Sequence, residues 1–380
     1  MRITNVQDAL LDWKAWNLVL TPINEAHVAA VTAGIKKSRA VEIWLWTIVA
    51  LVFAMVVVGG ATRLTDSGLS ITEWQPLLGA IPPMSESDWL AAFEKYKQIP
   101  QYALVNKGMA LTDFKFIYWW EWSHRLLGRL IGVAFALPFL FFWATGRLRG
   151  GLSLKLLGVL GLGALQGAIG WYMVKSGLAD RVSVSQYRLA LHLGTAFAII
   201  GLLVWLARDE GVARGAVHMG VISRSVRSGA LIVTALVALQ VVLGAFVAGL
   251  RAGLVYNTWP AMNGEWIPSS LNSMTPWYRN LFENMTTVQF DHRMVAYAVV
   301  IAALVQIYLV RRLPSNSSVR RSAAGLVAAV FAQAALGILT LLSGVKLELG
   351  LAHQAGAAIV LIAAVWHLHA TYRAPVEPKA

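Results

Sequence analysis

The sequence predicts an all-α polytopic membrane protein whose eight transmembrane helices form two repeated four-helix bundles. Hydrophobic residues make up 57% of the 380 residues and charged residues only 13%, about half the share that soluble proteins carry. Several apolar runs reach the ~20 residues that a helix needs to span a bilayer. The net charge of +13 comes mainly from Lys and Arg in the short connections between these runs. That distribution is the orientation signal of membrane proteins and argues against nucleic-acid binding.

Eight apolar runs are expected to span the membrane. They cover residues 41–61, 117–144, 154–174, 189–207, 230–250, 287–310, 323–342 and 349–367. Trp residues lie at many of their ends, as in the aromatic belts at bilayer surfaces.

Composition divides the chain into five parts. Residues 1–40 lack the continuous apolar core of a signal peptide and are expected to form a cytoplasmic or interfacial arm. Residues 41–210 form the first repeat and residues 229–370 the second. A cytoplasmic linker at 211–228 joins them, and a cytoplasmic tail follows at 371–380.

The positive charges set the orientation. With eight spans, the connections rich in Lys and Arg all fall on one side, which is then cytoplasmic. Both termini are then expected on the cytoplasmic side. The protein is expected in the bacterial cytoplasmic (inner) membrane. The long connections 62–116 and 251–286 face outward and are rich in Pro, Trp and Gly. They are expected to fold as packed caps around Trp74, Trp89, Trp259, Trp266 and Trp277.

The two halves repeat in sequence. Gln166 and Gly170 match Gln333 and Gly337 at a constant offset. The segment VVVGGATRL that begins at Val56 is similar to VVLGAFVAGL in the second half. Repeats of four spans keep the same orientation, so the halves are expected to be related by an axis along the membrane normal.

Four histidines occupy repeat-related positions. His124 and His292 open the second span of each half, and His192 and His353 open the fourth. All four are expected about one turn below the outer surface. A single membrane histidine is typically a hydrogen-bonding group between helices, but four at equivalent positions indicate ligands. The remaining histidines are interpreted as interfacial or solvated: His27, His218, His367 and His369.

Two histidines in each bundle favour haem as the ligand. The chain has no cysteine, so iron–sulfur ligation and thiol chemistry are excluded. Two ligands are too few for a closed zinc site, whereas two imidazoles on facing helices suit haem iron. The neighbouring glycines either let the macrocycle approach the backbone or serve helix packing; they are Gly128, Gly132 and Gly194.

Three arginines are candidates for contacts with the haem propionates. Arg125 and Arg129 follow His124, and Arg293 follows His292. A planar guanidinium matches a carboxylate, but an arginine near a helix end also extends to the interface without any ligand. Both interpretations are open from the sequence.

The halves differ at one acidic position. Glu121 lies three residues before His124 and therefore on the same helical face. Gln289 takes the equivalent place in the second half. This difference predicts one reactive haem and one electron-transfer haem. The alternative for Glu121 is a partner for an imidazole or an arginine.

Four segments of the sequence are distinctive: YWWEWSHRLLGRL at 118–130, the loop GGATRLTDSGLSITEWQPLLGAIPP at 59–83, LALHLGTAF and FDHRMVAY. Together they resemble the haem A synthase family, and the similarity covers nearly the whole chain after residue 40. That family converts haem O to haem A, the cofactor of cytochrome oxidase, by oxidising a ring methyl to a formyl group. The resemblance implies that His124 and His192 ligate the substrate haem, that His292 and His353 ligate a haem b cofactor, and that Glu121 is essential to the chemistry.

The resemblance also suggests partners. Haem O synthase and cytochrome oxidase assembly factors are candidates, besides haem O, haem A and membrane lipid. Some members of the family carry cysteine pairs in the outward loops, and this chain has none. The sequence leaves the electron partner and the oligomeric state open, a homo-oligomer included.

A bis-histidine haem has no free coordination position, so we hypothesise that water attacks the activated methyl carbon and that Glu121 positions or deprotonates it. Two other functions compete with this interpretation. A diheme electron-transfer cytochrome explains the four histidines but not the difference between Glu121 and Gln289. A transporter built on two repeats predicts broken helices near the middle of the membrane.

Overall fold

The computed structural model describes residues 38–75, 78–148, 151–180, 182–212 and 221–373. The predicted arm except its last three residues, most of the predicted tail, and His27 and His218 lie outside this part. In the described part, eight helices are long and apolar enough to cross a membrane, and the one β-bridge joins Met262 to Glu265. The prediction of an all-α polytopic membrane protein is confirmed.

The long helices contain all eight predicted spans. They are α3 (Arg39–Leu64), α6 (Leu111–Ala144), α7 (Leu152–Asp180), α8 (Gln186–Val212), α9 (Arg224–Leu250), α11 (Met285–Arg312), α12 (Ser317–Leu342) and α13 (Leu347–Tyr372).

All eight helices begin earlier than hydropathy alone predicts, and at α11 and α12 a polar capping residue lies outside the apolar run. Asn284 caps α11 by accepting hydrogen bonds from the backbone N–H groups of Thr286 and Thr287. Asn316 caps α12 by accepting from Val319 N at 2.9 Å. The helix therefore starts at its cap and not at its first apolar residue.

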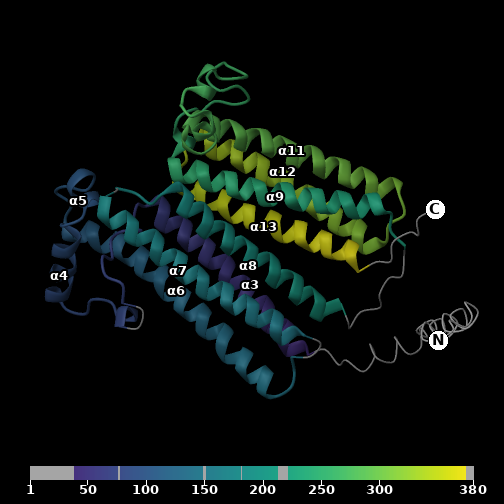
Figure 1. The fold of residues 1–380 in the computed structure, drawn as a ribbon, viewed down its shortest axis with the longest axis horizontal. Coiled ribbons are helices and arrows are strands. Elements are labelled where there is room, and N and C mark those ends of the chain that lie inside the picture. The colour runs from purple at the N-terminus through teal and green to yellow at the C-terminus, as the bar shows by residue number, and fades with distance from the viewer. Residues whose placement is uncertain (1–37, 76–77, 149–150, 181, 213–220, 374–380) are drawn as a thin grey trace, which may run out of the picture. The chain divides into compact units, whose positions relative to one another are not determined.

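The eight helices pack as two sets of four (Figure 1). In the first set, α3 packs on α6, α6 on α7, α7 on α8 and α8 back on α3. In the second set, α9, α11, α12 and α13 close a ring in the same order. In each ring the two helices that carry the predicted ligands, α6 and α8 or α11 and α13, are therefore diagonally opposite.

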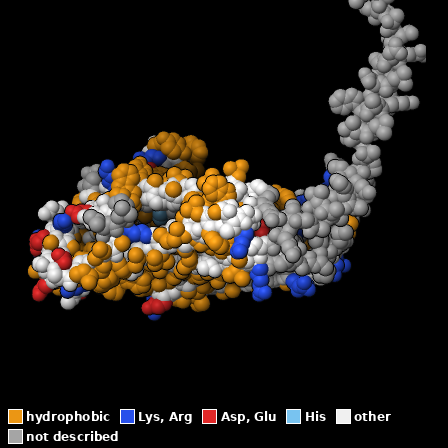
Figure 2. Space-filling view, turned by 90° about the horizontal axis from the view of Figure 1, so that it is seen from below, with side chains coloured by type: hydrophobic (Ala, Val, Ile, Leu, Met, Phe, Trp, Pro, Cys, Tyr) orange, Lys and Arg blue, Asp and Glu red, His pale blue; other side chains and the backbone are white. Residues whose placement is uncertain are grey.

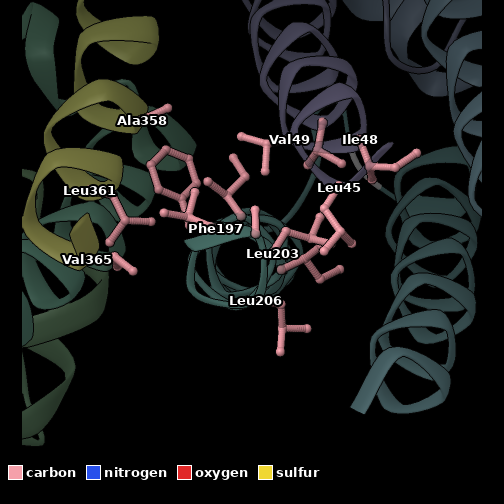
Figure 3. Packing of buried hydrophobic residues seen from close by; sticks show 14 of the residues in the cluster. Leu45, Ile48, Val49, Phe197, Leu203, Leu206, Ala358, Leu361 and Val365 are labelled. Carbon is pink, nitrogen blue, oxygen red and sulfur yellow. The ribbon is translucent and has the colours of Figure 1, made fainter. Parts of the chain in front are cut away.

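The sets meet through α8 on α9, α3 on α13, and α8 on α13. One hydrophobic cluster crosses this boundary, and Figure 3 shows part of it, with Leu45 from α3, Leu203 from α8 and Leu361 from α13. Leu45 lies near the start of α3, Leu203 in the second half of α8 and Leu361 near the middle of α13. The cluster therefore packs the two sets against each other.

The surface matches a lipid environment. Many large apolar side chains on the long helices are exposed, among them Leu137, Leu154 and Ile301. Figure 2 shows hydrophobic side chains over much of one face, with acidic side chains gathered at the end that carries α4. A soluble monomer rarely exposes apolar area of this extent.

The first outward connection folds against α6. It contains η1 (Leu78–Ala80), α4 (Glu86–Tyr96) and α5 (Pro100–Leu104). Trp89 is buried as predicted and contacts Tyr118, with ring centroids 5.0 Å apart. Since Phe114 and Tyr118 pack on α4, α6 extends one to two turns beyond its predicted span.

A capping box starts α4. Ser85 Oγ accepts a hydrogen bond from Asp88 N, and Asp88 Oδ2 accepts one from Ser85 N at 3.0 Å. The hydrogen bonds from Ser85 hold the pKa of the Asp88 carboxyl below its ordinary value.

The second outward connection depends on polar contacts and not on buried Trp side chains. It contains η2 (Ala252–Leu254), η3 (Ser269–Asn272), η4 (Trp277–Arg279) and α10 (Asn280–Glu283). Asn284 Nδ2 donates to Ser270 O at 2.8 Å, and Asn280 Nδ2 donates to Met274 O at 2.9 Å. The prediction of a Trp-packed cap is wrong for Trp266 and Trp277, which are 73% and 71% exposed.

The solvated interpretation of His367 and His369 is also wrong, because both side chains are fully buried. His367 lies between Gln306 Nε2 at 2.8 Å and Ser322 Oγ at 2.9 Å. His369 Nε2 lies 2.8 Å from Asp209 Oδ1. Helix α13 packs on α3, α8, α9 and α12, so opposite faces of its last turns are covered.

Candidate functional site

The four predicted ligands lie in the first half of their helices. His124 is on α6, His192 on α8, His292 on α11 and His353 on α13. All four side chains are half-buried. Within each ring of helices the two imidazoles are close enough to interact electrostatically, His124 with His192 and His292 with His353. The structure thus brings the histidines together in the predicted pairs.

Each imidazole lies against a glycine of the preceding long helix. A Cβ atom added to Gly59 would come within 3.1 Å of His124, and one added to Gly170 within 3.1 Å of His192. The corresponding distance is 3.1 Å from Gly244 to His292 and 2.8 Å from Gly337 to His353. Any larger residue would displace the ring, so these four glycines make room for the imidazoles.

The glycines singled out from the sequence play smaller parts. Gly128 lies near Met55, with the methyl carbon 3.2 Å from the position of an added Cβ atom. Gly194 makes only ordinary contact with Val242, and no atom lies within 4 Å of a Cβ atom added to Gly132. The repeat offered a signal for the relevant positions, since Gly170 matches Gly337 and Gly59 matches Gly244.

Glu121 is 2% exposed and has partners at both carboxylate oxygens. Oε2 accepts hydrogen bonds from Ser70 Oγ and Ile71 N, both at 2.8 Å. Oε1 accepts from Arg125 Nη2 at 2.6 Å and Arg125 Nε at 3.1 Å. The carboxylate therefore joins the outward loop to the helix that carries His124.

Arg125 completes this connection. Its Nη2 also donates to Ile71 O at 2.9 Å, and its Nη1 donates to Glu73 O at 3.0 Å. Its guanidinium carbon lies 5.9 Å from the ring centroid of Trp74, and Trp74 in turn contacts Trp171 on α7. Arg125 thereby fixes the loop above the first histidine pair.

The second half uses the same positions without a carboxylate. Gln289 Nε2 donates to Tyr256 O at 3.1 Å. Arg293 donates from Nη2 to Tyr256 O at 3.0 Å and from Nη1 to Thr258 O at 2.9 Å. Here too a helix that carries a ligand holds an outward loop, but no ion pair takes part.

The three predicted propionate contacts are all engaged with loop carbonyls. Arg129 Nη2 donates to Gln75 O at 2.9 Å, as Arg125 and Arg293 donate to their own loops. The role as anchors of the outward loops is thus visible in the structure, and propionate binding stays a prediction.

The residues fit a flat ring held between two imidazoles. The imidazoles come from diagonal helices, and the glycines leave them room. Nδ1 of His192 is buried without a hydrogen-bond partner. In the described part of the chain, no three His, Asp or Glu side chains gather as a metal cluster would. The paired imidazoles would be the residues that hold a haem iron.

Comparison with known proteins agrees with this geometry. Proteins named "Heme A synthase" from Parvibaculum lavamentivorans and Azorhizobium caulinodans are each 52% identical to this chain. The first alignment covers 87% of this chain and 94% of the relative, and the second covers 90% and 96%. A relative of the same name from Brucella ovis is also 52% identical, over 88% of this chain and 92% of its own. Residues 42–365 match the COX15-CtaA family, described as cytochrome oxidase assembly protein, and the chain belongs to this family.

Proposed function

We propose that this protein is a haem A synthase, which oxidises a ring methyl of haem O to the formyl group of haem A for cytochrome oxidase. The observation that carries the proposal is the arrangement of four histidines in two pairs, each histidine lying against a glycine. Among the described residues, a buried carboxylate, that of Glu121, accompanies the first pair, and Gln289 takes its place in the second half. The relatives that share 52% of their residues with this chain bear the name of that activity.

The two histidine pairs have different roles. His124 and His192 bind and orient the substrate haem O, and His292 and His353 hold a haem b cofactor. When bound, haem b supplies one-electron redox chemistry. This chain has no cysteine, so a redox disulfide of its own is excluded as the electron partner.

Glu121 acts as a positioning residue. Both of its oxygens are occupied by Ser70, Ile71 and Arg125. The carboxylate holds the loop over the substrate pair, and this geometry favours the arginine-partner interpretation over the general base suggested by the sequence.

The formyl oxygen is expected to come from water. If both imidazoles held the substrate iron, no open position would remain there, so water would be the simpler source of the formyl oxygen. Conversion of the methyl to the formyl group with oxygen from water releases four electrons and four protons, so the electron partner would have to accept those electrons. Turnover in labelled water should place the label in the formyl group, and label from dioxygen would contradict this.

We expect the protein to lie in the bacterial cytoplasmic membrane, with both termini inside and the haem sites near the outer face. The absence of cysteine makes this easy to test. Ser87→Cys, in the first outward connection, should react with an impermeant thiol reagent in intact cells, and Ser317→Cys should not. Haem O synthase and oxidase assembly factors are candidate neighbours, detectable by crosslinking from the same single cysteines.

A diheme electron-transfer cytochrome is the second candidate, because four histidines would serve it equally well. The buried Glu121 against Gln289 favours the enzyme, since two permanent haems give no reason for that difference. Haem extraction from purified protein separates the two, as only the enzyme should contain haem O or its oxidised products.

A further inference from the structure

A cavity lies between α9 and α11, at the end of these helices that is far from the histidines. Its volume is about 350 Å³, at the lower end of the range of ligand pockets. It is lined by one face of α9 between Arg224 and Ile232 and by one face of α11 between Ala302 and Leu309. Along α11, Ala302 is about 15 Å from His292. The cavity is therefore separate from the proposed haem sites.

The lining of the cavity changes from polar to apolar along α9. Arg224, Ser225 and Ser228 come first, and Ile232 lies about 12 Å along the helix from Arg224. The polar layer at each surface of a bilayer is only about 5–7 Å thick, so a cavity of this length extends from the headgroups into the hydrocarbon. None of the described residues that line it is acidic. This gradient matches a phospholipid, which has an anionic phosphate at one end and acyl chains beyond it.

The cavity opens toward the surroundings of the bundle. Ile232 and Val305 line it and are 55% and 51% exposed. The adjacent side chains of Leu231 and Leu304 are also exposed. In a membrane protein such apolar side chains face lipid. A lipid molecule can therefore enter from the side, without passing through the helices.

The polar end of the cavity lies at a membrane surface. Near the end of α11, Tyr308 is exposed, and the guanidinium carbon of Arg312 lies 5.8 Å from its ring centroid. Tyrosine and arginine at a helix end mark the level of the headgroups. Helix α9 begins at this level with Arg224, and its capping residue Ser223 makes no side-chain hydrogen bond to the first turn. An anion is favoured at such a position by the helix dipole and by the arginine.

The internal repeat offers a comparison for this cavity. The match of VVVGG on α3 to VVLGA on α9 places Trp44 at the position of Gly229. The burial of neighbouring residues supports this register, since Val41 and the equivalent Val226 are both fully buried. The first half therefore has a large aromatic side chain where the second half has none.

Trp44 fills the space between α3 and α6. Its Nε1 donates to Ala134 O at 3.0 Å. Pro138, four residues later, has no N–H for that carbonyl, so the indole satisfies it instead. The ring of Trp44 also contacts Phe135 and Phe142, with centroids 5.2 Å and 5.4 Å apart. In the first half the chain thus closes this place with its own side chains.

The second half leaves the equivalent space open. Ala303 and Val310 stand where α6 has the two phenylalanines, and Gly229 stands where α3 has the tryptophan. Gln306 forms the buried back of the cavity. Its Oε1 lies against Gly229 and is buried without a hydrogen-bond partner. A buried acceptor left unpaired is costly, and a hydroxyl group of a bound headgroup would satisfy it.

We propose that this cavity binds one anionic phospholipid. The phosphate lies at Arg224 and the hydroxyl groups of Ser225 and Ser228, and an acyl chain follows Ile232 and Ala302. The lipid fills between α9 and α11 the space that an indole fills between α3 and α6. The site is independent of the haems and of the proposed function.

Native mass spectrometry of the purified full-length protein tests this proposal, with phosphatidylglycerol and phosphatidylcholine as the probes. The protein should retain one phosphatidylglycerol per chain in preference to phosphatidylcholine. Arg224→Gln should weaken that binding by about fivefold, the usual contribution of one basic residue near an anionic membrane surface. Arg321→Gln is the matched control, because Arg321 is an exposed arginine on α12 that does not line the cavity. It should bind the lipid as the unaltered protein does.

Ser228→Phe fills the cavity and should abolish retention of the phosphatidylglycerol. Leu231→Phe is its control, since Leu231 is exposed on the same helix but lies outside the cavity. Size-exclusion profiles and helical circular dichroism show whether each variant folds, and Arg224→Gln decides the matter if Ser228→Phe does not. Equal retention of both lipids, or unchanged retention in folded Arg224→Gln, would overturn the proposal. So would a dimer mass in place of bound lipid, which would assign the cavity to a second copy of the chain.

Discussion

Arg125 donates two hydrogen bonds to one carboxylate oxygen of Glu121, one turn before it on α6. The same guanidinium binds the carbonyl oxygens of Ile71 and Glu73. The ion pair is therefore part of a connection between an outward loop and the helix of His124. In the second half, Gln289 and Arg293 both donate hydrogen bonds to the carbonyl oxygen of Tyr256.

If Glu121 works by holding the loop, Glu121→Gln and Arg125→Gln should have the same effect. Each is expected to retain bound haem and to slow haem A formation by about a hundredfold, since small misplacements of a site are that costly. Haem content and product formation measure this. Glu73→Gln is the control, because Glu73 lies in the same loop but is largely exposed. Loss of activity in Glu121→Gln with full activity in Arg125→Gln would instead identify Glu121 as the base.

The requirement for the glycines that lie against the histidines can be tested at Gly337. Its added Cβ atom would lie 2.8 Å from Cε1 of His353, so Gly337→Ala must displace the ring. The expected result is loss of the second-half haem signal from the optical spectrum, while the first-half signal remains. Gly325→Ala on the same helix meets no atom within 4 Å and should leave both signals unchanged. A normal spectrum in Gly337→Ala would show that a glycine is not required beside His353.

His367 is predicted to be structural. Its fully buried side chain lies between the buried Gln306 and the half-buried Ser322. His367→Ala removes the partner of the buried Gln306 amide, which should lower the free energy of unfolding by about 1–3 kcal/mol. Thermal denaturation of the purified protein measures this. The haem content and spectrum should not change, and loss of either haem would show that His367 belongs to a functional site.

Much of the fold was accessible from the sequence, because hydropathy and length directly determine which segments can span a bilayer. The repeat-related positions of His124, His192, His292 and His353 also followed from simple spacing. The contacts between the four glycines and the histidines did not follow from spacing, since the face that a helix turns toward its neighbour depends on packing. The burial of His367 and His369 was missed for a related reason. Two residues on different faces are both covered only when helices surround α13 on several sides.

Two of the three partners of Glu121, Ser70 and Ile71, lay beyond sequence reasoning as well. Its spacing to His124 suggested chemistry at the haem, whereas the structure pairs it with Arg125, Ser70 and Ile71. Helical spacing predicts the i, i+4 pair with Arg125. The contacts with Ser70 and Ile71 depend on how a long loop folds back, for which no periodicity exists.

The most direct test of the proposed function is extraction and identification of the haems from protein purified from cells with and without a haem O synthase. With haem O supplied, the protein should contain haem b together with haem O, an oxidised intermediate or haem A, and without that supply only haem b. A colourless protein, or one that carries only haem b in both cases, would contradict the account.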